Sequence, residues 1–122
     1  MTRIEFVKMV ASGNDFVVID NRREIIHGLK LHAFAGEICD RNYGVGADGL
    51  IAIEPSKKAD FRMRIINPDG SEAEMCGNGA RCIALFAKEK KIAGKNMSFE
   101  TLSGIIEAEV CDKAVRLKMP DP

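Results

Sequence analysis

The stretch GNGARCIALFAKEKK, residues 77–91, has the strongest helical pattern in the chain. Its apolar side chains recur almost all the way round a helix and are interrupted only by Arg81. A helix with this pattern is buried on most of its sides rather than lying on a surface. Three lysines near its end complement the negative pole of the helix dipole, and Gly94 is the expected stop signal. We therefore expect the rest of the chain to enclose this helix.

Seven strands are predicted around this helix, from alternating or β-branched patterns that end at turn-forming residues. They are expected at Arg3–Val10, Phe16–Asp20, Gly49–Glu54, Asp60–Ile66, Asn96–Thr101, Ile105–Cys111 and Ala114–Met119. A second, shorter amphipathic helix is expected at Leu31–Arg41. We predict an α+β fold in which an antiparallel β-sheet or barrel is wrapped around the central buried helix.

The composition is that of one ordinary globular domain. The chain has 122 residues, of which 46% are hydrophobic and 30% charged. Eighteen basic and eighteen acidic residues cancel, so no overall field favours nucleic acid or an anionic membrane as a partner. No apolar run approaches the roughly 20 residues that span a bilayer, and the first residues lack the apolar core of a signal peptide. We expect a cytoplasmic protein.

The four cysteines, at positions 39, 76, 82 and 111, do not form a recognisable framework. Their spacing is irregular and includes no C-x-x-C, which argues against both a disulfide scaffold and a zinc site. We expect no metal. Cys39, Cys82 and Cys111 are interpreted as small buried hydrophobic residues. Cys76 requires a separate interpretation.

Residues 44–49, GVGADG, match the dinucleotide-binding pattern G-x-G-x-x-G letter for letter. That pattern binds a pyrophosphate only when a strand enters it and a helix leaves it. Here the expected helix comes first and the expected strand follows, so we reject nucleotide binding. The glycines are better explained by a tight backbone course at the start of a strand.

Cys76 comes just before the first turn of the buried helix, where unpaired amides and the positive end of the dipole stabilise an anion. A thiol placed there can have its pKa lowered toward neutrality, which makes the thiolate available as a base or nucleophile. Gly77 and Gly79 would let a small carboxylate approach the amides closely. From these residues alone, a buried cysteine capped by a glycine-rich turn is an equally good interpretation.

Four motifs, taken together, resemble a known family. MCGNGARC at residues 75–82 resembles the first active-site motif of diaminopimelate epimerases. GNDF at 13–16, GVGADG at 44–49 and NPDGSE at 67–72 resemble other N-terminal motifs of that family, in the same order. The resemblance covers essentially the whole chain.

The resemblance implies an isomerase that interconverts LL- and meso-diaminopimelate without pyridoxal phosphate or metal, in the synthesis of lysine and peptidoglycan precursors. Family enzymes move the Cα proton with two cysteines on opposite faces of the substrate, and Cys76 matches the first of them. Gly77 and Asn78 would offer helix amides to the α-carboxylate of the substrate. Asn14 and Asn67 match asparagines that contact the substrate.

The sequence also departs from the family pattern. Gly49 stands where many members carry a glutamine that contacts the substrate. Val10-Ala11-Ser12 precede Gly13, where histidine and glycine are common in the family. None of the other three cysteines has the sequence context of the second catalytic cysteine.

The missing second cysteine bears on the domain organisation. Family enzymes have two similar domains with the active site between them. By resemblance, residues 1–122 form the N-terminal diaminopimelate epimerase-like domain, and the C-terminal domain is absent. We expect that the chain alone does not epimerise diaminopimelate, and that its exposed interface would favour a homodimer.

Two other functions fit the sequence. The chain could be a non-catalytic carboxylate-binding or interaction domain that keeps the fold. It could also be another cofactor-independent isomerase, such as a proline racemase relative, although residues 78–81, NGAR, disfavour that assignment.

Overall fold

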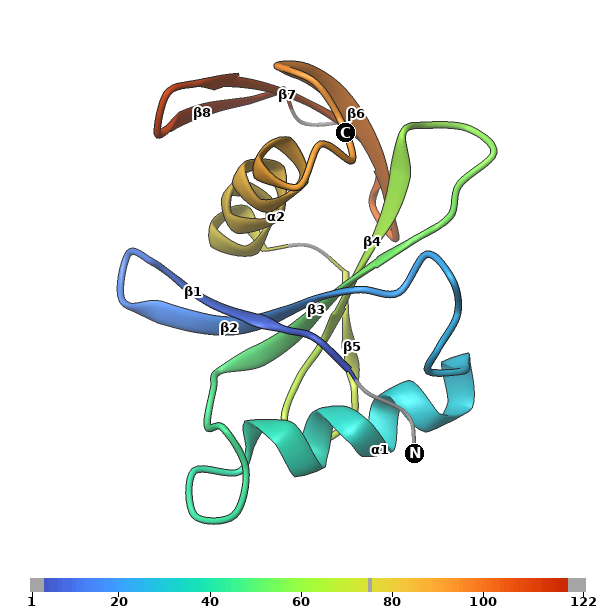
Figure 1. Cartoon of the computed structure of the whole chain (residues 1–122), viewed down its shortest axis with the longest axis vertical. Helices are drawn as coiled ribbons and strands as arrows, with labels where there is room; N and C mark the ends of the chain where they lie inside the picture. Colours follow the sequence, from blue (N-terminus) through green and yellow to red (C-terminus); the bar gives the residue numbers. More distant parts are fainter. Residues whose placement is uncertain (1–3, 75, 119–122) are drawn as a thin grey trace.

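The computed structural model describes residues 4–74 and 76–118. In these residues a sheet in the order β1-β2-β3-β4-β6-β7-β8 curls around one helix, α2, and β5 pairs with β4 outside that order (Figure 1). The elements are β1 (Val7–Ala11), β2 (Asn14–Asp20), α1 (Gly28–Cys39), β3 (Gly49–Glu54), β4 (Phe61–Ile66), β5 (Glu72–Ala73), α2 (Gly77–Glu89), β6 (Asn96–Thr101), β7 (Gly104–Cys111) and β8 (Ala114–Lys118). The predicted α+β class and the buried central helix are confirmed.

The pairing of the sheet is mixed rather than antiparallel throughout. β2 and β3 are parallel, and so are β4 and β6; the other pairs are antiparallel. The reason lies in the connections. Parallel neighbours require a long crossover, and each of these two pairs is joined through a helix, α1 in the first case and α2 in the second. The antiparallel expectation was therefore wrong at these two pairings.

The central strands are buried on both faces, which divides the interior into two cores. Ile51 and Ile53 of β3 belong to the core around α2, whereas Leu50 and Ala52 belong to the core beneath α1. Figure 1 shows the two helices on opposite sides of these strands. Strands that are buried on both faces typically have continuous apolar sequences rather than alternating apolar and polar residues.

Helix α1 ends at a turn that is held by the side chain of Asp40. It buries Leu31, Ala35 and Cys39 at intervals of four residues, as its amphipathic pattern predicts. The carboxylate of Asp40 then accepts the backbone N–H groups of Asn42 and Tyr43, at 2.8 and 3.0 Å, and turns the chain away from the helix. The helix occupies residues 28–39 rather than the predicted 31–41.

The local sequence patterns predicted the bounds of the outer strands less accurately. The two-residue strand β5 was not predicted, because so short a segment shows no alternation. The strand predicted from Arg3 begins at Val7, and the one predicted to Met119 ends at Lys118; both predicted ends lie outside the described residues. Within the described residues, no helix is both long and apolar enough to cross a membrane.

The C-terminus of α2 differs from the prediction. The helix ends at Glu89, before the expected stop at Gly94. Lys91 adopts a left-handed conformation with φ +58°, and the N–H of Ile92 donates to the carbonyl of Ala87 at 2.8 Å. This is the Schellman arrangement, in which the left-handed residue is usually glycine.

We expect Lys91→Gly to stabilise the protein by about 0.5–1 kcal/mol, because a residue with a Cβ pays a steric cost in the left-handed region. The free energy of unfolding in urea measures this effect. Lys88→Gly is the control, since the same substitution inside the helix should cost about 1 kcal/mol. Loss of stability in Lys91→Gly would contradict the assignment of this cap.

Candidate active site at the start of α2

Cys76 is the N-cap residue of α2. Its backbone is extended, with φ −141° and ψ 119°, and its carbonyl accepts the N–H of Ala80 at 2.8 Å. The sulfur Sγ accepts the N–H of Gly79 at 3.5 Å, and the residue is half-buried. The thiol therefore lies at the positive end of the helix, where the first amides have no acceptor within the helix itself.

The two glycines of the first turn have different roles. A Cβ at Gly79 would lie 3.2 Å from Cδ1 of Ile51 and 3.3 Å from Cδ1 of Ile65, so this glycine lets the helix start pack tightly on the sheet. A Cβ at Gly77 would approach only the guanidinium of Arg81, at 3.6 Å. Gly77 thus leaves its side of the first turn open, as carboxylate binding requires.

Two of the predicted substrate residues contact each other directly. The side-chain amide of Asn78, in the first turn of α2, donates to Oδ1 of Asn14 at 2.8 Å. Asn14 is the first residue of β2, and its own amide points to Oδ2 of Asp48 at 3.5 Å. This bond joins the start of α2 to the β1–β2 hairpin, and both asparagines are half-buried.

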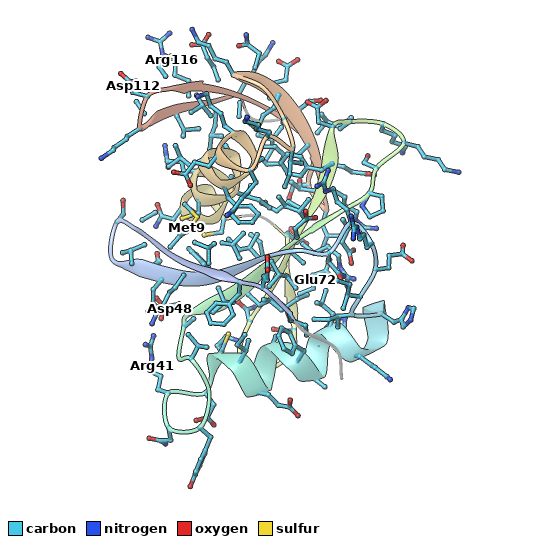
Figure 2. The ribbon with its side chains drawn as sticks, viewed as in Figure 1. Met9, Arg41, Asp48, Glu72, Asp112 and Arg116 are labelled. Carbon is cyan, nitrogen blue, oxygen red and sulfur yellow. The ribbon has the colours of Figure 1, made fainter. Side chains whose placement is uncertain are left out.

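A charged cluster holds the hairpin to the loop between α1 and β3. The carboxylate of Asp15 pairs with Arg41 at 3.1 Å and with Lys8 at 3.3 Å. Asp15 and Asp48 also exchange bonds, because each backbone N–H donates to the other's carboxylate, at 2.9 and 3.0 Å. Figure 2 shows Arg41 and Asp48 on this loop, beneath the hairpin. The cluster thereby fixes the position of Asn14.

The cluster also sets the charge state of Asp15. The Arg41 guanidinium holds the pKa of Asp15 well below its usual range. Lys8 and Asp48 lower the pKa further, and burial opposes them. Asp15 therefore remains a carboxylate throughout the neutral range.

Sequence reasoning missed this cluster. Its members come from the hairpin, from the end of α1 and from the loop before β3, and only the structure brings them together. The sole local signal was the placement of Asp15 and Asp48 directly before the two predicted strands Phe16–Asp20 and Gly49–Glu54.

Residues 44–49 follow a tight backbone course that leads into a strand, as predicted. A Cβ at Gly44 would lie 2.2 Å from the carbonyl oxygen of Glu37 in α1, so only glycine fits there. Gly46 has φ +83°, a conformation that favours glycine. The segment follows α1 and leads into β3, the reverse of the order in a nucleotide-binding loop.

Asn67 lies in the turn after β4, apart from the Asn14–Asn78 pair. Its amide donates to Oγ of Ser71 at 3.0 Å, and its carbonyl accepts the N–H of Gly70 at 2.9 Å. The strand register places this turn at the same end of the sheet as Asn14, because β4 ends where β2 and β3 begin. Two strand spacings separate β2 from β4, which is about 10 Å.

Gly49 occupies the strand between these two asparagines. A Cβ there would make ordinary contacts, at 3.4 Å to the Phe16 ring and 3.5 Å to the carbonyl of Ile66. The position therefore has room for a Cβ.

The remaining cysteines differ in exposure. Cys39 and Cys82 are buried as predicted, and burial raises the pKa of both thiols. Cys111 is exposed, so its prediction as a buried residue was wrong. It ends β7 on the outer face of the alternating strand, next to the turn into β8. All four thiols are free.

We expect iodoacetamide to modify Cys76 and Cys111 in the folded protein and to leave Cys39 and Cys82 unmodified, because buried thiols are inaccessible and less ionised. Peptide mass spectrometry after brief labelling measures the four sites separately. Labelling in denaturant, where all four should react, is the control. Modification of Cys82 as fast as Cys111 would contradict the packing of α2.

The charged cluster predicts an acid dependence of stability. Because the pKa of Asp15 is lower in the folded than in the unfolded state, its contribution is complete above about pH 4 and is lost as the pH falls below that value. Asp15→Asn should therefore be less stable than wild type at pH 7, and the difference should shrink progressively below pH ~4.

Urea unfolding at several pH values measures this difference. Asp112→Asn, on an exposed turn, is the charge-matched control and should run parallel to wild type. A gap between Asp15→Asn and wild type that grows on acidification would refute the assignment.

The sequence model of one family, diaminopimelate epimerase, matches residues 6–122. The chain belongs to the diaminopimelate epimerase family. Among curated members, the diaminopimelate epimerase of Carboxydothermus hydrogenoformans is 52% identical over 122 residues, which cover 98% of this chain and 44% of that protein. The enzyme of Archaeoglobus fulgidus is 50% identical over 109 residues, covering 88% of this chain and 39% of that protein. The 122-residue chain thus spans about two-fifths of the length of these two relatives.

Solved structures of other proteins share the fold. A probable proline racemase from Agrobacterium radiobacter aligns with a TM-score of 0.71 at 16% identity, over 94% of this chain and 41% of that one. A PhzF-family phenazine biosynthesis protein from Bacillus anthracis aligns with a TM-score of 0.69 at 20% identity, over 95% and 38% of the two chains. At these sequence identities the similarity extends to the fold of this chain and not to its chemistry.

Proposed function

We propose that this domain forms one half of the active site of a cofactor-independent epimerase that interconverts LL- and meso-diaminopimelate. The observation that carries the proposal is the thiol of Cys76 at the N-terminus of α2, next to the Asn14–Asn78 pair. Membership of the diaminopimelate epimerase family supports the substrate. The reaction belongs to the synthesis of lysine and of peptidoglycan precursors, which takes place in the cytoplasm.

The Cα proton of an amino acid is very weakly acidic, so its removal demands accurate placement and stabilisation of the developing charge. In the proposed mechanism, the first amides of α2, at Gly77 and Asn78, hold the α-carboxylate. This places Cα beside Cys76, whose thiolate takes the proton from one face. A second cysteine, protonated, delivers a proton to the opposite face.

Asn14 and Asn67 would bind the polar groups of the substrate. They lie at the same end of the sheet on either side of Gly49. The amide of Asn67 is held by Ser71 in the free protein, which orients its carbonyl and amide before binding. Preorganised donors and acceptors of this kind reduce the entropic cost of binding.

The second cysteine is proposed to come from a second domain. Neither buried cysteine, Cys39 or Cys82, is accessible, and Cys111 lies at the end of β7, beside the turn into β8. The matched relatives are more than twice as long as this chain, which leaves length for such a domain in those proteins. We therefore expect the 122-residue chain alone to show no epimerisation and no exchange of the Cα hydrogen.

A chimera tests the proposal. The segment of the Carboxydothermus enzyme that aligns with this chain is replaced by residues 1–122, and Cα–deuterium exchange and epimerisation of diaminopimelate are followed by NMR in D2O. The chimera should be active. Cys76→Ser in the chimera should lower the rate by about 10²–10⁴-fold, because it removes a proton-transferring group.

Cys111→Ser is the matched control and should remain within about twofold of the unsubstituted chimera, since surface changes away from a site have small effects. A rate that Cys76→Ser leaves unchanged would refute the catalytic role. A folded but inactive chimera, prepared beside an active parent enzyme, would refute the proposed function itself.

A further inference from the structure

A polar network occupies the side of the sheet that faces α1. Its centre is Arg64 of β4, whose side chain is only 13% exposed. The guanidinium donates to Glu72 of β5, through Nε at 3.0 Å and also through Nη2, and to Glu54 of β3 at 3.4 Å. Figure 2 shows Glu72 at β5, on the α1 side of the sheet. We call Arg64, Glu54, Glu72 and His32 the Arg64 network.

His32 of α1 completes this network, because each of its two ring nitrogens has a hydrogen-bonding partner. Nε2 lies 3.4 Å from Nη2 of Arg64, and Nδ1 faces the carbonyl oxygen of Gly70 within hydrogen-bond distance. A guanidinium offers only donors and a carbonyl only acceptors. A ring with its hydrogen on Nδ1 and a lone pair on Nε2 would donate to Gly70 and accept from Arg64.

The carbonyl that His32 holds belongs to the turn that carries Asn67. Gly70 also donates its N–H to the carbonyl of Asn67, at 2.9 Å, so the two residues are bonded directly. One helical turn after His32, a Cβ at Gly36 would lie 3.3 Å from the carbonyl of Pro68. Residues four apart share one helix face, so α1 supports the turn at two adjacent points.

We propose that His32 is a positioning residue for Asn67. Oriented by Arg64, His32 holds the Gly70 carbonyl and thereby keeps the Asn67 side chain in place for substrate. The same guanidinium holds Glu72, four residues before Cys76, so one half-buried cation ties together the turn and the segment that leads to the proposed catalytic cysteine. This inference rests on the proposed function in one respect, because that function supplies the substrate that Asn67 would bind.

Three variants of the chain separate positioning from simple stability. His32→Leu removes both hydrogen bonds of the ring. His32→Asn keeps a donor near the position of Nδ1 and loses the acceptor at Nε2. Val110→Ala is a control that destabilises the other core, because Val110 is buried on β7.

The first readout needs no ligand. Hydrogen exchange of the Asn67 side-chain amide and of the Gly70 backbone N–H is measured by NMR, with the stability of each variant. His32→Leu should speed exchange at both groups by about tenfold, the equivalent of one hydrogen bond. His32→Asn should restore most of the protection, and Val110→Ala should leave it near wild type. Unchanged exchange in His32→Leu, or an equal rise in Val110→Ala, would overturn the proposal.

The second readout is kinetic and uses the chimera. His32→Leu should raise KM for diaminopimelate by about tenfold with little change in kcat, because a lost binding contact acts on substrate and transition state alike. A fall in kcat at constant KM would contradict positioning through Asn67. If the unsubstituted chimera has no activity, the proposed function fails, and the exchange measurement still decides the role of His32.

Discussion

The close packing of the α2 N-terminus on the sheet is the constraint on which the site depends. Gly79 brings the first turn against Ile51 and Ile65, where a Cβ would be crowded by both isoleucines. Because α2 is enclosed by the curled sheet, its start cannot shift along its axis without disturbing the core. The thiol of Cys76 and the open amides of the first turn are thereby fixed relative to β2, β3 and β4. A rigid element carries the chemical groups, and turns complete the site around it.

The site combines segments that are distant in the chain but meet at one end of the sheet. The Asn14–Asn78 bond spans 64 residues, and the Asp15 cluster ties the hairpin to the loop after α1. On the other face, the Arg64 network supports the Asn67 turn through α1. Both helices thus meet the same end of the sheet: α2 begins at Cys76, and α1 contacts the turn that carries Asn67.

Local patterns predicted the elements well and their long-range relations poorly. The buried helix and the strands each carry a periodicity of their own, so their existence followed from the sequence. The parallel pairings of β2 with β3 and of β4 with β6 depend on crossovers that no local pattern records, and β5 is too short to show one. For the site, the placement of Cys76 at a helix start was readable from the residues. The proposed roles of Asn14 and Asn67 came only from resemblance, whereas the contacts of Asp48, Arg41 and His32 came only from the structure.

The central claim is geometric: the substrate carboxylate binds the first amides of α2, with Cα beside Cys76. A crystal structure of the Cys76→Ser chimera with meso-diaminopimelate tests it most directly. The account predicts one carboxylate within about 3 Å of the amide nitrogens of Gly77 and Asn78, and Cα within about 3.5 Å of the serine oxygen. A substrate bound with its carboxylates away from the start of α2, or with Cα out of reach of residue 76, would contradict it.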